Sequence, residues 1–140
     1  MPADDLASAF AAVPCNRFLG LRLLSRSPER TELELPLRPE FLQEEGVVQG
    51  GILTALADMA AVYLLWPDLG PDRSMTGTDA AMRFLAAALP GRGPLRAIGT
   101  RLRSGRTLAV CESEVFQAGE RVAKGTFTFL LRPRRAASPQ

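Results

Sequence analysis

The 140 residues of the chain suffice for one domain with a buried core, and 46% hydrophobic and 23% charged residues is an ordinary globular composition. A net charge of +2, from 17 basic and 15 acidic side chains, gives no broad field that would attract nucleic acid or an anionic membrane. The sequence contains no histidine, which excludes Ser-His-Asp and Cys-His triads and histidine-ligated zinc. Any chemistry must therefore use carboxylates, hydroxyls, amides, backbone donors or a basic side chain.

The two cysteines and the first residues indicate a reducing compartment. Cys15 and Cys111 lie far apart, without C-x-x-C spacing or the cysteine density of a secreted disulfide scaffold. The sequence begins without the positive and apolar regions of a signal peptide. We therefore expect a cytoplasmic protein.

The first third of the chain predicts a short helix and a hairpin. Asp4 to Ala12 has apolar residues at helical spacing behind acidic residues, and Pro14 ends this helix. Leu21 to Arg26 and Thr31 to Leu37 read as two strands, because Ser27-Pro28-Glu29-Arg30 between them is a turn signal and the second run alternates leucine with Glu32, Glu34 and Pro36.

The longest apolar stretch, Val47 to Trp66, predicts a helix of roughly five turns at about 3.6 residues per turn. Gly50 and Gly51 stand near its start, and Pro67 follows its end. Its length would allow a membrane span, but a central aspartate, Asp58, costs about 2.5 to 3.5 kcal/mol in a bilayer. We therefore expect a buried core helix and no membrane association.

The second half predicts a run of strands separated by glycine-containing turns. The strand candidates are Ser74 to Leu85, Leu95 to Arg103, Thr107 to Phe116 and Arg121 to Leu131. With the preceding elements they predict an α+β fold, in which an antiparallel sheet wraps around one long central helix within a single domain spanning residues 1–140. The Pro- and Arg-rich segment 132–140 is predicted to be a frayed tail.

The chemistry is expected on the long helix. Asp58 is its only side chain expected to be charged, and an unpaired carboxylate on a buried helix must be paired, protonated or facing a cavity. Gly51 lies seven residues earlier, about two turns, so both residues face nearly the same side, and free amides at the helix start suit an oxyanion. The alternative is that the glycines only permit tight packing and that an arginine such as Arg83 neutralises Asp58.

The segment Gly46-Val47-Val48-Gln49-Gly50-Gly51-Ile52-Leu53-Thr54-Ala55-Leu56-Ala57-Asp58 resembles the helix-start signature of hot-dog-fold thioesterases of the phenylacetate-pathway type, G-x-x-H-G-G-x-x-x-x-L-x-D. Three other segments resemble the family more weakly and stand in the family's order along the chain: Phe18-Leu19-Gly20, Phe84-Leu85-Ala86-Ala87-Ala88 and Arg103-Ser104-Gly105-Arg106-Thr107-Leu108-Ala109. The resemblance spans roughly Phe18 to Leu131 and implies the hot-dog fold.

The resemblance implies hydrolysis of an acyl thioester, typically acyl-CoA, without cofactor or metal. Gly51 N–H would polarise the thioester carbonyl, and Asp58 would act as a general base on water or as a nucleophile that forms a transient anhydride. Substrate contacts are implied at Gly50, Thr76, Gly77, Thr78, Phe84, Leu85, Ala86, Arg103, Ser104, Gly105, Arg106 and Thr107, where the arginines would suit the phosphates of CoA. An ordinary solvated hairpin explains these arginines equally well.

Three positions depart from the family pattern. Gln49 stands at the usual histidine and Gln43 at an asparagine often found upstream. Both amide side chains can still donate hydrogen bonds, so Gln49 and Gln43 are expected to assist Asp58 and Gly51 in catalysis. The polar residue often found on the strand facing the aspartate falls at Gly77, between Thr76 and Thr78. These departures leave open a noncatalytic dimer that binds acyl-CoA or lipid.

The resemblance also implies a homodimer or homotetramer with its pockets at the subunit interface. We expect apolar pocket walls, with Phe41, Leu56, Met59 and Phe84 as contacts. No nucleic-acid partner is expected, since the arginines of the tail are better explained as solubilising groups.

Overall fold

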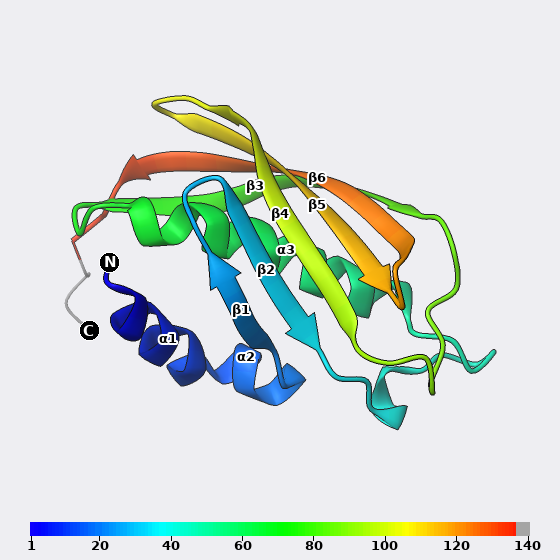
Figure 1. Ribbon diagram of the computed structural model, residues 1–140. Coiled ribbons are helices and arrows are strands. Elements are labelled where there is room, and N and C mark those ends of the chain that lie inside the picture. The colour runs from blue at the N-terminus through cyan, green and yellow to red at the C-terminus, as the bar shows by residue number, and fades with distance from the viewer. Residues whose placement is uncertain (137–140) are drawn as a thin grey trace.

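The computed structural model describes residues 1–136, and it has the predicted α+β architecture, with six antiparallel strands curved around one long helix (Figure 1). The helices are α1 (Ala3–Ala12), α2 (Pro14–Leu19) and α3 (Gly50–Leu65). The strands are β1 (Arg22–Arg26), β2 (Arg30–Leu35), β3 (Arg73–Phe84), β4 (Leu95–Ser104), β5 (Leu108–Gln117) and β6 (Glu120–Pro133), and single 3-10 turns lie at Pro39–Phe41 and Trp66–Asp68.

The sheet order is β1-β2-β4-β5-β6-β3. The predicted meander is present in β4, β5 and β6, but β3 does not pair with β4, which follows it in sequence. The chain instead passes from β3, at one edge, to β4 in the middle of the sheet. This leaves β3 as a 12-residue edge strand that, within residues 1–136, pairs only with β6.

Pro14 both ends α1 and begins α2, a helix that the sequence analysis did not predict. A proline fits the first helical position because the amide there has no intrahelical acceptor in any case. Gly20, with φ of 75°, ends α2 in the left-handed conformation that glycine adopts readily. The two short helices are held to α3 by the Asn16 side chain, which donates to the Tyr63 hydroxyl over 2.9 Å.

Helix α3 begins three residues later than predicted and ends one residue earlier. The preceding residues form a loop that is tied to the connection between β3 and β4, because Val48 N–H donates to Ala88 C=O over 2.9 Å. The core face of α3 packs on the sheet through Leu53, Leu56, Ala57, Ala60 and Leu64. The stretch Gly50–Asp68 is long and apolar enough to cross a membrane, but half of it is buried within the fold, as in a core helix.

Two arginines bind the carboxyl end of α3. Arg26 donates from Nε to Tyr63 C=O and from Nη2 to Leu64 C=O, and Arg101 Nη2 donates to Leu64 C=O over 3.1 Å. Both guanidinium groups also pair with Asp68, at 2.7 and 2.8 Å. Positive charge at a helix C-terminus offsets the helix dipole and satisfies carbonyls that lack an intrahelical donor.

Strand β6 continues two residues into the segment that the sequence predicts to be a tail. Arg132 pairs with Ser74 in the register of β3 and β6, and Arg134 N–H donates to Asp72 C=O over 2.7 Å. The remainder of the predicted tail, residues 137–140, lies outside the described residues.

Candidate active site

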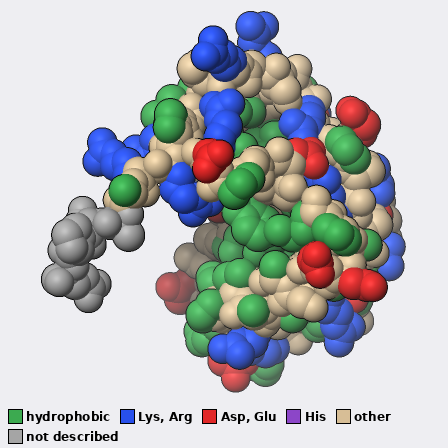
Figure 2. Space-filling view, turned by 90° about the vertical axis from the view of Figure 1, so that its left-hand side faces the viewer, with side chains coloured by type: hydrophobic (Ala, Val, Ile, Leu, Met, Phe, Trp, Pro, Cys, Tyr) green, Lys and Arg blue, Asp and Glu red, His purple; other side chains and the backbone are tan. Residues whose placement is uncertain are grey.

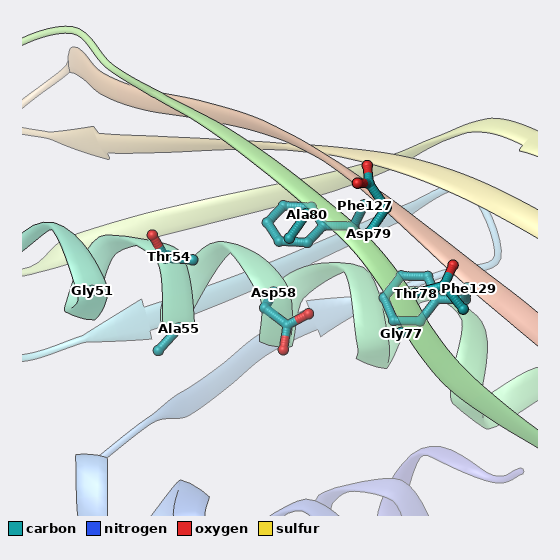
Figure 3. Close-up of a pocket in the computed structure, with 10 residues that line it drawn as sticks. All are labelled: Gly51, Thr54, Ala55, Asp58, Gly77, Thr78, Asp79, Ala80, Phe127 and Phe129. Carbon is teal, nitrogen blue, oxygen red and sulfur yellow. The ribbon is translucent and has the colours of Figure 1, made fainter.

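A cavity of about 580 Å³ lies between α3 and the edge strand β3, and Asp58 forms part of its wall (Figure 3). One side is a single stripe of the helix, because Gly51, Thr54, Ala55 and Asp58 recur every three or four residues. The other side comes from β3 and its neighbour β6, through Gly77, Thr78, Asp79, Ala80, Phe127 and Phe129.

The Asp58 carboxyl is partly buried and has no ion pair or hydrogen bond with any residue from 1 to 136. Burial raises its pKa above the ordinary value of 3.8, because a charged carboxylate loses solvation in an apolar wall. Arg83, the alternative neutralising partner, is exposed and donates to Met82 C=O over 3.3 Å. The carboxyl therefore faces the cavity without the permanent partner that would explain it structurally.

The amino end of α3 is uncapped, in contrast to its carboxyl end. Gln49 occupies the cap position without a side-chain hydrogen bond to the helix, and its carbonyl accepts from Ile52 N–H over 2.9 Å. Within the described part of the chain, the N–H groups of Gly50 and Gly51 donate to no acceptor. Gly51 is exposed at the cavity, so its amide is available to a ligand oxygen.

The two predicted glutamines differ in their placement. Gln49 is exposed beside the helix start, and its side chain bonds to no described residue, so it is free to reach a ligand. The Gln43 side chain instead accepts from Glu45 N–H and stabilises the turn before Gly46. Gln43 is also absent from the cavity wall, so the structure does not bring it to Asp58.

A β-bulge in β3 decides which residue faces the cavity opposite Asp58. Gly77 pairs with Phe129 and Asp79 with Thr128, so Thr78 is an extra residue in the strand. Its hydroxyl donates to Thr128 C=O over 3.4 Å. Gly77 and Thr78 line the cavity but Thr76 does not, and the Thr76 hydroxyl accepts instead from Arg132 over 3.2 Å.

The residues predicted to bind CoA fall into two groups at opposite ends of the sheet. Phe84 lies over Gly50 at the amino end of α3, where its ring is 3.2 Å from the position of a Cβ on that glycine. The hairpin Arg103 to Thr107 lies at the other end, where Arg73 Nη2 donates to Arg106 C=O over 2.7 Å. The two groups lie at opposite ends of the 12-residue strand β3, about 35 Å apart at 3.3 Å per residue. Residues of both groups in one chain therefore cannot contact the same end of one substrate molecule.

Two of the expected pocket walls are core residues instead. Phe41 and Leu56 are 3% and 0% exposed, on the side of the fold that packs against the sheet, and neither lines the cavity. Met59 is partly buried against the core, and Phe84 is 56% exposed. Leu56 is two residues before Asp58, which is about 200° around the helix at about 100° per residue, so its side chain points into the core on nearly the opposite face from the cavity.

The sequence analysis missed six lining residues: Thr54, Ala55, Asp79, Ala80, Phe127 and Phe129. The first two could have been found from their three- and four-residue spacing to Gly51 and Asp58. The phenylalanines depend on the pairing of β3 with β6, which no local pattern reveals. In residues 1–136 no group of three Cys, Asp or Glu side chains is arranged to hold a metal ion.

Comparison with known proteins places this geometry in a family. Residues 45–124 match the thioesterase superfamily. A protein from Deinococcus radiodurans named "Putative esterase" is 32% identical over 102 residues, which cover 73% of this chain and 66% of that protein, just under two thirds of its length.

Solved structures agree with this assignment. AziG of S. sahachiroi is 26% identical, with a TM-score of 0.80 over 84% of this chain and 95% of its own. A phenylacetic acid degradation-related protein from Ralstonia eutropha JMP134 is 27% identical, with a TM-score of 0.83 over 91% of this chain and 97% of its own. The chain therefore belongs to the thioesterase superfamily, a family of thioester hydrolases, and has the hot-dog fold.

Proposed function

We propose that this protein hydrolyses an acyl thioester, with acyl-CoA as the substrate, to the free acid and the thiol. The observation that supports this proposal most is the unpaired Asp58 carboxyl in a cavity that also contains the free N–H of Gly51. A base and an oxyanion donor on one rigid helix are what thioester hydrolysis requires.

In this reaction the thioester carbonyl oxygen accepts from Gly51 N–H, which stabilises the negative charge that develops there. Asp58 takes a proton from a water molecule as the water oxygen bonds to the carbonyl carbon. The tetrahedral intermediate then collapses, the C–S bond breaks, and the thiolate leaves and is protonated. In the variant pathway the Asp58 carboxylate attacks the carbon itself, and water hydrolyses the resulting anhydride. Gln49 is placed to supply a further donor.

We further propose a cytoplasmic homodimer or homotetramer in which two β3 strands pair edge to edge. Eight of the nine β3 residues 76–84 are exposed to solvent. The exposed residues include the apolar side chains of Ala80, Ala81 and Phe84, which a second strand could cover. Antiparallel pairing of this strand with its symmetry copy would bring the Phe84 end of one chain beside the Arg103–Thr107 hairpin of the other. Such a dimer would reunite the two groups of predicted CoA contacts.

The test compares Asp58→Asn with Asp79→Asn on a panel of acyl-CoA substrates. Both side chains line the cavity, but Figure 3 shows the Asp79 carboxyl pointing away from Asp58, so Asp79→Asn is a matched control for the loss of one negative charge. We expect Asp58→Asn to lower kcat by about 100-fold or more, the low end of general-base catalysis, and Asp79→Asn to change it little.

Equal rates for Asp58→Asn and wild type would reject catalysis by Asp58. Tight binding of acyl-CoA by a wild-type protein that does not turn it over would instead identify a noncatalytic binding dimer.

A further inference from the structure

The arginines that have no acidic partner are concentrated at one end of the molecule. Of the 17 basic side chains, eight form ion pairs with aspartate or glutamate, mostly on the outer face of the sheet. Nine form no ion pair with a described residue, and six of these nine make up what we call the arginine end: Arg73, Arg103, Arg106, Arg132, Arg134 and Arg135.

The backbone brings these six residues together from three segments. Arg73, at the start of β3, donates to Arg106 C=O in the β4–β5 hairpin, and Arg134 Nη2 donates to Arg73 C=O over 3.1 Å. Leu131 N–H donates to Thr107 C=O over 2.7 Å and ties β6 to the same hairpin. Figure 2 faces this end and shows Lys and Arg side chains over the hairpin and the last strand.

The charge of the molecule is therefore strongly asymmetric. Asp72 lies at the same end, where its C=O accepts from Arg134 N–H, so the arginine end carries six basic side chains beside this one acidic residue, and the rest of the chain carries 11 basic against 14 acidic side chains. Charges of one sign on one face produce a local potential that steers an oppositely charged partner, even when the net charge is small.

Exposed leucines lie within the same surface. Leu108 and Leu130 are register partners on β5 and β6 and are 47% and 36% exposed, and Leu102, in the β-bulge of β4, is 56% exposed. Apolar side chains surrounded by arginine are the composition of a protein interface, in which arginine is enriched. A small phosphorylated molecule would bind the arginines through its phosphates and would not cover leucines on the outer face of the sheet.

The arginine end also adjoins the cavity. Arg132 donates to the hydroxyl of Thr76, the residue that precedes Gly77 in the cavity wall. Along α3, Asp58 lies seven residues from the end of the helix at Leu65, about 10 Å at 1.5 Å per residue. A flexible arm attached to a partner bound at the arginine end could thus reach Asp58.

We propose that the arginine end docks a small acidic carrier protein, which delivers the acyl group as a thioester on its phosphopantetheine arm. This inference rests on the proposed thioester hydrolysis, and it makes a carrier protein, in preference to CoA, the carrier of the acyl group. The acidic surface of the carrier pairs with the arginines, its apolar side chains cover the leucines, and the arm enters the cavity with the thioester at Asp58. Hydrolysis breaks the C–S bond and returns the carrier with a free thiol.

The experiment measures kcat/KM for one acyl group on three carriers: an acidic acyl carrier protein, CoA, and pantetheine, which lacks both the protein and the nucleotide phosphates. The variants are Arg103→Glu and Arg106→Glu, whose side chains make no described hydrogen bond. Arg17→Glu is the matched control, because Arg17 is also exposed and unpaired but lies on α2.

We expect each arginine-end variant to lower kcat/KM for the carrier-protein thioester by about 10-fold at low salt and to leave the pantetheine thioester unchanged. The wild-type preference for the carrier protein should fall as salt rises, because exposed charges are screened over about 10 Å at 0.1 M. Arg17→Glu should behave as wild type with all three substrates.

Three outcomes would overturn the docking proposal. One is a loss confined to the CoA thioester, which would assign the arginines to nucleotide phosphates. Another is binding of the wild-type protein to anionic lipid vesicles without any preference for the carrier protein, which would assign them to a membrane surface. The third is equal kcat/KM for all variants on the carrier-protein thioester.

Failure of the proposed function gives a different result. In that case the wild type hydrolyses none of the three thioesters, including the one on the carrier protein. Titration of the unacylated carrier protein against wild type and Arg103→Glu would then still report docking, since it requires no turnover.

Discussion

The two ends of α3 are built in opposite ways. At the carboxyl end, Arg26 and Arg101 bind the carbonyls of Tyr63 and Leu64 and share Asp68. At the amino end, the N–H groups of Gly50 and Gly51 find no acceptor in residues 1–136. One end of the helix is thus satisfied by the protein itself, whereas the other leaves two donors unpaired, and it is to these donors that the proposed reaction brings the thioester carbonyl.

The largest expected effect comes from removing the free donor at the amino end. Proline is tolerated in the first helical turn but has no N–H, so Gly51→Pro removes the donor while keeping the helix. Loss of one oxyanion donor lowers kcat by about 100- to 1000-fold, and steady-state kinetics with acyl-CoA would measure this change.

Gly51→Ala is the matched control for that variant. Its Cβ would meet only the Gln49 side chain, at 4.0 Å, and it keeps the N–H. Its kcat should therefore stay near that of wild type. A similar loss in both variants would show that the N–H is not the group that matters.

The second effect concerns stability and the carboxyl end. Arg26→Met keeps a similar length but leaves two helix carbonyls and Asp68 with one donor fewer, which should cost about 1.5 to 3 kcal/mol. Urea denaturation would measure this loss, while kcat of the folded protein should hardly change.

Arg22→Met tests whether that loss is specific to the helix end. Arg22 is 64% exposed and pairs with Glu34 at 3.3 Å, so its removal should cost less than about 1 kcal/mol. Equal losses in the two variants would contradict a special role for Arg26.

The middle of the helix gives the third prediction, because α3 approaches β4 closely at Gly99. A Cβ at this position would lie 2.8 Å from Ala60 C=O, a backbone atom that cannot move without shifting the helix. Gly99→Ala should therefore lower the free energy of unfolding by about 1 to 3 kcal/mol. In Gly70→Ala the new Cβ meets nothing within 4 Å, so this variant should unfold as wild type does.

The smallest effect is a pH dependence of opposite sign at two carboxyl groups, Asp68 beyond the carboxyl end of α3 and Asp58 in its middle. Hydrogen bonding to Arg26 lowers the pKa of Asp68 below 3.8, so its stabilisation is present above that value and is lost as the pH falls through the lowered pKa. Burial raises the pKa of Asp58, so its stabilising contribution is present below 3.8 and is lost as the pH rises through the raised pKa.

Thermal melts of Asp58→Asn and Asp68→Asn would resolve the two contributions. At neutral pH the first variant should melt above wild type and the second below it. The kcat/KM of the wild type should in turn rise with pH as Asp58 loses its proton. A melting temperature lowered by Asp58→Asn would argue against an uncompensated carboxylate in the cavity.

The sequence predicted those parts of the site that depend on a single element. Gly51 and Asp58 lie on one helix, and helical geometry alone places them on one stripe. The fold class and the strand segments followed from alternation and turn signals, with boundaries within three residues. The long-range pairing of β3 with β6 and the bulge at Thr78 depend on tertiary contacts that no local pattern encodes.

Strand β3 has a consequence for how this scaffold can diversify. The cavity residues that it supplies, Gly77 to Ala80, are all exposed and lie outside the core that holds α3 to the sheet. Within one chain, substitutions there can reshape the cavity at little thermodynamic cost, since surface changes away from packed or strained positions usually alter stability by no more than about 0.5 kcal/mol, and in the proposed dimer they must also fit the paired strand. Under the proposed function, substrate preference can thus evolve on the edge strand while the helix that carries Gly51 and Asp58 stays constant.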